Sequence, residues 1–288
     1  LDYYWKDNAP KEFQQDIFRR QLALGVRRIG NVHIGGPMSA TDAAVAIYYK
    51  YMDFDPDKLD DPNRNQFILS KGHNGILLYT IFCDMGMYDW DLLLDTYNTI
   101  GNPFGAHPNR KHVKGIEVST GSLGHGINWA CGMAHANRDK NIKSRIWVML
   151  GDGEMEEGSN WEGILYAASH GLDNIVAVVD YNHASAAYEI NQNNRWGEKG
   201  GPEGLADCYR AFGWNAVIID GTKMAEIKAG TGKGVYKYAM AVSPLDCMGC
   251  GVCISQCPTG AIEMVAMESQ LPEQEVFNYM VAEVSEKK

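Results

Sequence analysis

Two oxygen-bearing side chains follow two apolar runs in the middle of the sequence. Asp152 stands between glycines in the stretch 151–158 (GDGEMEEG), directly after the apolar run 145–150, and Asn182 follows the apolar run 175–179. Apolar runs of this length predict buried parallel strands, whose carboxyl ends form the crevice where ligands bind. Hard oxygen ligands with glycines and a helix N-terminus beside them suit a divalent cation that carries a diphosphate.

The residues between the two runs predict a connecting helix, which makes the segment a βαβ unit. Ser159 and Asn160 are typical helix-capping residues, and helical spacing follows them as far as residue 172. Glutamates at this helix start are favoured by the helix dipole, and we interpret Glu154 and Glu156 as solvated.

The composition limits the classes of protein to which the chain can belong. With 288 residues, 45% hydrophobic and 22% charged, it has the composition of a soluble globular protein with one large domain and a small appendage. The net charge of −10 argues against nucleic acid as a partner. No apolar run approaches a membrane span and no signal peptide is recognisable, so we expect a cytoplasmic protein.

Other segments place glycine and polar groups at the ends of predicted elements. The run 66–69 predicts a short buried strand that ends in Ser70–His73, and the glycine-rich stretch 118–126 opens a helix of small residues. The stretch Gly30–Pro37 predicts a loop, because two glycines and a proline disfavour a continuing helix. A further strand is predicted at 216–219.

In combination these stretches resemble the diphosphate-binding half of transketolase, and specifically the N-terminal subunit of split transketolases, over roughly residues 10–235. The matching stretches are His33 in its Gly-Pro loop, Ser70–His73, His107-Pro108, Ser119–Gly124, and Gly151–Glu162 with Asn182. The resemblance implies a thiamine diphosphate-binding α/β fold, with a parallel sheet flanked by helices. It also implies transfer of a two-carbon ketol unit between sugar phosphates.

The resemblance implies roles for the residues around the predicted cation. Asp152 and Asn182 match the side-chain ligands of Mg²⁺ (or Ca²⁺), and the backbone carbonyl of Ala184 matches the third protein ligand. Gly153 matches a backbone donor to the diphosphate, and His73 a histidine near the phosphates.

It also implies roles around the cofactor rings and the substrate. Gly121 and Leu123 match the residues that hold the rings. His33 and His107 match catalytic histidines that face the substrate hydroxyls. Glu157 matches the carboxylate that communicates across the dimer with the glutamate that activates the cofactor.

Two features of the chain differ from complete members of this family. Where the family has a histidine after the Asp-Gly of its last strand, this chain has Thr222, and the segment 222–235 is shortened. The module that binds the aminopyrimidine ring is not found in the 288 residues. We therefore expect activity only with a second, pyrimidine-binding subunit, in an α2β2 assembly.

Four of the seven cysteines lie close together near the C-terminus. Cys247, Cys250, Cys253 and Cys257-Pro have the spacing of a bacterial ferredoxin loop, which predicts ligands of a [4Fe-4S] cluster. In such loops the fourth cysteine normally binds a second cluster, and no second run of cysteines is present. The stretch 237–275 resembles part of the ferredoxin domain of pyruvate:ferredoxin oxidoreductases.

The transketolase-like stretches and the cysteine cluster predict two domains, and they leave three functions open. We expect a thiamine diphosphate-binding domain at 1–230, and a ferredoxin-like iron–sulfur segment with an acidic tail at 231–288. The C-terminal segment is either a genuine fusion or part of a different polypeptide joined at 222–240. The function that we favour is a transketolase-type subunit, and the alternatives are a component of a 2-oxoacid:ferredoxin oxidoreductase and a subunit that keeps the fold without turnover.

Overall fold

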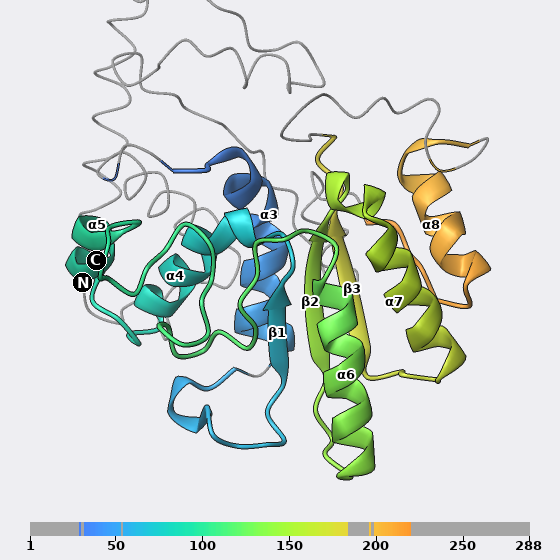
Figure 1. The fold of residues 1–288 in the computed structure, drawn as a ribbon, viewed down its shortest axis with the longest axis horizontal. Coiled ribbons are helices and arrows are strands. Elements are labelled where there is room, and N and C mark those ends of the chain that lie inside the picture. Colours follow the sequence, from blue (N-terminus) through green and yellow to red (C-terminus); the bar gives the residue numbers. More distant parts are fainter. Residues whose placement is uncertain (1–28, 30–31, 53, 184–195, 197–198, 220–288) are drawn as a thin grey trace, which may run out of the picture. The chain divides into compact units, whose positions relative to one another are not determined.

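A computed structural model of the chain describes residues 29, 32–52, 54–183, 196 and 199–219, all within one compact unit (Figure 1). The elements are α3 (Gly35–Ala46), the π-helix η1 (Ile47–Tyr51), the 3-10 helix η2 (Pro56–Lys58), β1 (Gln66–Leu69), the 3-10 helix η3 (Gly72–Asn74), α4 (Gly75–Asp84), α5 (Trp90–Thr96), α6 (Gly126–Asp139), β2 (Ile146–Gly151), the 3-10 helix η4 (Gly153–Glu156), α7 (Gly158–Ser169), β3 (Ile175–Asp180) and α8 (Gly201–Ala211).

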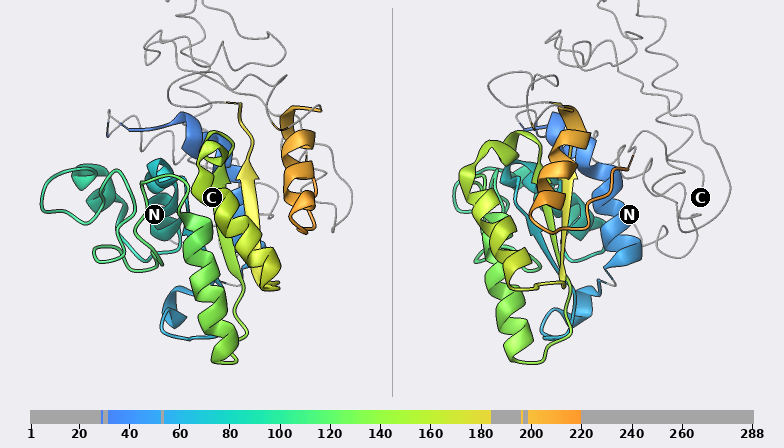
Figure 2. Two further views of the ribbon diagram at one scale, coloured as in Figure 1. Left: turned by 45° about the vertical axis from the view of Figure 1, so that its right-hand side comes forward. Right: turned by 90° about the vertical axis from the view of Figure 1, so that its right-hand side faces the viewer.

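The three strands of the described ranges form one parallel sheet in the order β1-β2-β3. Helices α6 and α7 cover one face of the sheet and α3 covers the other, as the right-hand view of Figure 2 shows. The predicted fold class, an α/β protein with a parallel sheet flanked by helices, is therefore confirmed. The βαβ unit predicted around residue 152 is β2-α7-β3.

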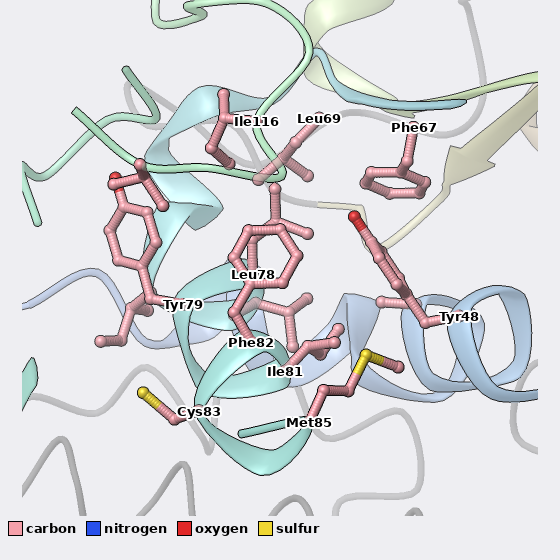
Figure 3. Packing of buried hydrophobic residues seen from close by; sticks show 14 of the residues in the cluster. Tyr48, Phe67, Leu69, Leu78, Tyr79, Ile81, Phe82, Cys83, Met85 and Ile116 are labelled. Carbon is pink, nitrogen blue, oxygen red and sulfur yellow. The ribbon is translucent and has the colours of Figure 1, made fainter. Parts of the chain in front are cut away.

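Side chains alternate between the two faces of the sheet and build a separate core on each. Phe67, Leu69 and Met149 pack with α3 and α4, whereas Ile68 and Val148 pack with α6 and α7. This alternation follows from the two-residue period of a strand, and burial of both faces explains why the strands read as unbroken apolar runs. Figure 3 shows the first core, where the rings of α4 meet strand side chains.

Two local predictions are wrong, each for a physical reason. Gly35–Pro37 forms the first turn of α3 and not a loop, because the first residues of a helix have no acceptor for their N–H groups and proline needs none. Residues 216–219 form no strand, and Val217 and Ile219 are exposed. The carbonyl of Ala216 is bound by the guanidinium of Arg210 and not by a neighbouring strand of the described sheet.

Several predictions fall outside the described residues. These are the domain boundary near residue 230, the carbonyl of Ala184, the departure at Thr222 and the four clustered cysteines. Within the described ranges, no helix has the length and apolarity that crossing a membrane requires.

Candidate functional site

The ends of β2 and β3 bring Asp152 and Asn182 together, as the spacing predicts. Pairing of the strands runs to Gly151 opposite Asp180, and the amide of Asp152 donates to the carbonyl of Asp180 (3.2 Å). The Asp152 side chain is 1% exposed and accepts two backbone N–H bonds, from Gly153 to Oδ1 (2.9 Å) and from His183 to Oδ2 (2.7 Å). The bond from His183 fixes the loop that carries Asn182 beside the Asp152 carboxylate.

A buried ion pair that the sequence reading did not single out lies next to this pair. The ammonium of Lys71, a residue whose side chain is 2% exposed, donates to Asp180 Oδ2 at 2.6 Å. The same oxygen accepts from Ser39 Oγ (2.5 Å) and from Asn182 Nδ2 (3.4 Å), and Asn182 Nδ2 also donates to Ser39 Oγ (3.0 Å). Ser39 and Asp180 thereby position Asn182, and Lys71 holds Asp180 in place. The sequence feature that could have pointed to this ion pair is the position of Asp180 at the end of a predicted strand.

The environment of Asp152 fits a divalent cation. Burial raises the pKa of its carboxyl, and the nearby Asp180 carboxylate raises it further, against the lowering effect of the two backbone amides and of Lys71. A buried carboxylate of this kind gains most from a bound metal, which favours its ionised form. No group of three or more His, Cys, Asp or Glu side chains suits a metal within the described ranges. The predicted ligands are instead one carboxylate, one amide and the carbonyl of Ala184.

The three histidines predicted at the site converge from three separate segments. The ring of His33 lies 5.9 Å from that of His73 and 6.5 Å from that of His107, between centroids. Burial, aided by the charges of Lys71, His33 and His107, lowers the pKa of His73 to about 4, and burial also lowers the pKa of His107. Both imidazoles are therefore neutral at pH 7 and can donate and accept hydrogen bonds.

This pKa gives a testable pH dependence for the chain without bound ligand. The folded pKa of His73, about 4, lies below its ordinary value of 6.5, so the unfolded chain binds this proton first as the pH falls. We expect the free energy of unfolding to decrease as the pH falls from 6.5 towards 4, and NMR titration of His73 to give a midpoint near 4. The resonance is assigned by its loss in His73→Gln. A midpoint near 6.5 would contradict the described burial.

The glycine-rich stretch before α6 lies against these histidines. Gly121 has a φ of +154°, and a Cβ there would meet the His107 ring at 3.2 Å. A Cβ on Gly72 would meet the backbone nitrogen of Gly121 at 2.6 Å, so the two loops are in backbone contact. A pocket of about 660 Å³ opens beside them, lined by Ser119, Thr120, Gly121, Ser122, His125, Asn128 and Trp129. Leu123, predicted to hold a cofactor ring, is partly buried in the same loop.

The contact between these loops predicts the effect of a single methyl group. Gly72→Ala must displace the backbone of Gly121 and Thr120, which we expect to cost about 1–3 kcal/mol of unfolding free energy. Gly132→Ala is the matched control, because no atom lies within 4 Å of the added Cβ and the residue is within a helix. Chemical denaturation of the two variants measures the difference. Equal stabilities would contradict the described approach of the loops.

The acidic turn after β2 differs from the prediction in two respects. Glu154, interpreted as solvated, is 2% exposed, whereas Glu156 and Glu157 are exposed. Ser159 and Asn160 do not cap α7. The Ser159 hydroxyl donates to the carbonyl of Gly124 (2.8 Å), and the Asn160 amide donates to the carbonyl of Glu154 (2.7 Å). These side chains hold the acidic turn against the glycine loop.

The fold and the site together define a class of α/β proteins that bind a ligand at the carboxyl ends of parallel strands. The family described as "Transketolase, thiamine diphosphate binding domain" matches residues 16–237, and a "4Fe-4S binding domain" matches residues 240–263. The chain belongs to the transketolase family, through its thiamine diphosphate-binding domain.

Individual relatives and a solved structure match about three quarters of this chain. The chain is 34% identical over 216 residues to "6-deoxy-6-sulfo-D-fructose transketolase subunit SqwG" of a Clostridium species, covering 75% of this chain and 76% of that one. It is 32% identical to "Ferredoxin fas2" of Rhodococcoides fascians, covering 76% of this chain and 68% of that one. The crystal structure of Campylobacter jejuni transketolase matches with a TM-score of 0.65 and 26% identity, over 75% of this chain and 34% of that chain. The chain thus spans about a third of that transketolase.

Proposed function

We propose that the chain is the diphosphate-binding subunit of a two-part transketolase, which transfers a two-carbon ketol unit between sugar phosphates. The observations that carry the proposal are that Asp152 and the loop of Asn182 meet at the ends of β2 and β3, and that three histidines (His33, His73 and His107) meet one another, with His73 near the Lys71–Asp180 pair. These residues come from segments that are distant in the sequence. The family match over residues 16–237 supports the assignment.

In this proposal one group of residues binds the cofactor and another group contacts the sugar substrate. Asp152 and Asn182, with the carbonyl of Ala184, would hold Mg²⁺ and through it the diphosphate of thiamine diphosphate. The cofactor supplies the electron sink for breaking and forming a carbon–carbon bond. In this structure the Gly153 amide donates to Asp152. A short 3-10 turn begins at Gly153, where backbone N–H groups favour an anion.

The neutral histidines suit exchange of protons with sugar hydroxyls. Because the pKa values of His73 and His107 are lowered, each ring keeps one nitrogen as an acceptor and one as a donor at pH 7. We assign His33 and His107 to the substrate hydroxyls and His73 to the phosphates. Gly121 and Leu123 would hold the cofactor rings beside them, where a side chain on Gly121 would meet His107.

A second subunit completes the proposed site. The resemblance assigns the pyrimidine-binding module and the activating glutamate to that partner, in an α2β2 assembly. Glu157, exposed at the N-terminus of α7, is the residue that we expect to communicate with that glutamate. The relative SqwG is itself called a subunit, which supports the existence of a partner subunit.

The test is ketol transfer by the reconstituted pair. The chain and its pyrimidine-binding partner, with thiamine diphosphate and Mg²⁺, should transfer the two-carbon unit from a ketose phosphate to an aldose phosphate, and neither subunit alone should do so. A panel of phosphorylated and sulfonated ketoses identifies the donor, since SqwG is named for a sulfonated sugar. Absence of magnesium-dependent cofactor binding by the pair would contradict the proposal.

The iron–sulfur match at residues 240–263 favours a second candidate, a component of a 2-oxoacid:ferredoxin oxidoreductase. In it Cys247, Cys250 and Cys253 would bind a [4Fe-4S] cluster, and Cys257 would bind that cluster or a second one. Iron, sulfide and magnesium per chain, together with 2-oxoacid-dependent reduction of ferredoxin, distinguish the candidates. A colourless protein without iron would eliminate this one.

We further propose that the chain consists of two domains, 1–230 and 231–288. The proposed boundary lies between Gly221, where the compact unit ends, and residue 237, where the transketolase match ends. The similarity to a protein named ferredoxin supports a genuine fusion over a join of two polypeptides. Limited proteolysis should release a stable fragment that ends between residues 221 and 240.

A further inference from the structure

We propose that Glu154 is a positioning residue that ties together the three loops of the cofactor site, an inference that rests on the proposed function. Glu154 follows Asp152 and Gly153 in the acidic turn, but its side chain points into the protein and is 2% exposed. Its backbone is held as well, because the Asn160 amide donates to its carbonyl at 2.7 Å.

The Glu154 carboxylate accepts hydrogen bonds from three different segments. Oε2 accepts from the amide of Gly151, at the end of β2 (3.1 Å). Oε1 accepts from the amide of Gly124, in the glycine loop before α6 (2.8 Å), and from the hydroxyl of Ser70, at the end of β1. One side chain thus joins the segment that carries Asp152, the loop that carries Gly121, and the segment that carries His73.

The Ser70 hydroxyl extends this connection to the helix. It accepts from the amide of Gly126 (3.1 Å), the first residue of α6, while it donates to Glu154. The glycine loop is therefore bound twice, directly at Gly124 and through Ser70 at Gly126. A Cβ on Gly126 would meet the Ser70 Cβ at 2.4 Å, so only glycine allows this approach.

These contacts satisfy a buried group that would otherwise be costly. Burial raises the pKa of Glu154, and the bonds from Ser70, Gly124 and Gly151 lower it, as does Lys71. Replacing one oxygen of a buried carboxylate that accepts several hydrogen bonds costs more stability than the same change in an exposed carboxylate. The reason is that water does not take the place of the lost acceptor. None of the three partners of the Glu154 carboxylate is a predicted metal ligand, so its proposed effect on the site is exerted through the loops.

The experiment replaces the acceptor and keeps the shape. In Glu154→Gln an NH₂ group must face at least one N–H or O–H donor, which releases either Gly151 or the Ser70–Gly124 side. Glu156→Gln makes the same change at an exposed position of the same turn and is the control. Hydrogen exchange by mass spectrometry on the full chain, and thiamine diphosphate affinity of the chain with its partner and Mg²⁺, are measured for both variants.

We expect amide exchange at residues 119–126 and 150–153 to become at least about tenfold faster in Glu154→Gln, with exchange in α4 unchanged. We expect the cofactor dissociation constant to rise at least about tenfold. Ser70→Ala should act in the same direction, and its effect on binding should not add to that of Glu154→Gln. Glu156→Gln should match the unmodified chain.

Unchanged exchange in both loops of Glu154→Gln would overturn the inference, and so would additive effects of the two substitutions. Faster exchange throughout the chain would also overturn it, because it would show a general structural role. If the unmodified pair does not bind the cofactor, the proposed function fails. The exchange measurement still decides whether Glu154 holds the loops.

Discussion

Asp152→Asn is expected to weaken magnesium-dependent binding of thiamine diphosphate by more than about a hundredfold. Loss of a residue that only hydrogen-bonds to a metal ligand already lowers metal affinity by about 10–100-fold, and Asp152 is a predicted ligand itself. The substitution keeps the size of the side chain but removes the charge that the cation needs. It also replaces one of the two oxygens that accept from Gly153 and His183 with an amide nitrogen. The loop that carries Asn182 should therefore loosen at the same time.

Calorimetric titration of the reconstituted pair measures this effect. Asp173→Asn is the control, because Asp173 is exposed in the turn before β3 and lies outside the proposed site. The control should retain the affinity of the unmodified chain. If Asp152→Asn kept its magnesium-dependent affinity for thiamine diphosphate, the cation would not be bound at the ends of β2 and β3.

Lys71→Met should lower the free energy of unfolding by about 3–5 kcal/mol, because it leaves the Asp180 carboxylate buried without its cation. The Lys71 side chain is 2% exposed and that of Asp180 11%, so solvent screens this ion pair little. Lys71 also lowers the pKa of His73, which should therefore rise in the variant. Denaturant titration and NMR titration of His73 measure the two effects.

The chain offers a matched exposed ion pair as the control. Lys199 and Asp207 are separated by the same 2.6 Å, but their side chains are 65% and 40% exposed. Lys199→Met should leave stability almost unchanged, since solvent screens such a pair. Similar losses of unfolding free energy in both variants would contradict the view that burial makes the Lys71–Asp180 pair strongly stabilising.

The parts of the fold that could be predicted are those in which local sequence and burial agree. The runs 66–69 and 145–150 are mostly buried and the run 175–179 is mostly half-buried, and their apolar composition agrees with the parallel strands that they form. Residues 216–219 have the same apolar composition and form no strand. Their local pattern cannot report whether a neighbouring strand is available to pair with them.

The candidate site shows the same division between local and long-range information. Asp152, Asn182 and the three histidines could be selected because each stands within two residues of glycine or proline, or just after the end of a strand. Glu154 could not, because it differs from Glu156 only in the direction of its side chain within one turn. The contacts that distinguish it come from Ser70 and Gly124, which are distant in the sequence.

We propose that Asp152 and Asn182 hold a divalent cation bound to the cofactor diphosphate. Electron–nuclear double resonance of the reconstituted pair with thiamine diphosphate, with Mn²⁺ in place of Mg²⁺, tests this coordination. We predict Mn²⁺ coupled to ³¹P of the diphosphate, with the coupling lost in Asp152→Asn. Cofactor bound without ³¹P coupling to the metal, or coupling that persists in Asp152→Asn, would contradict the account.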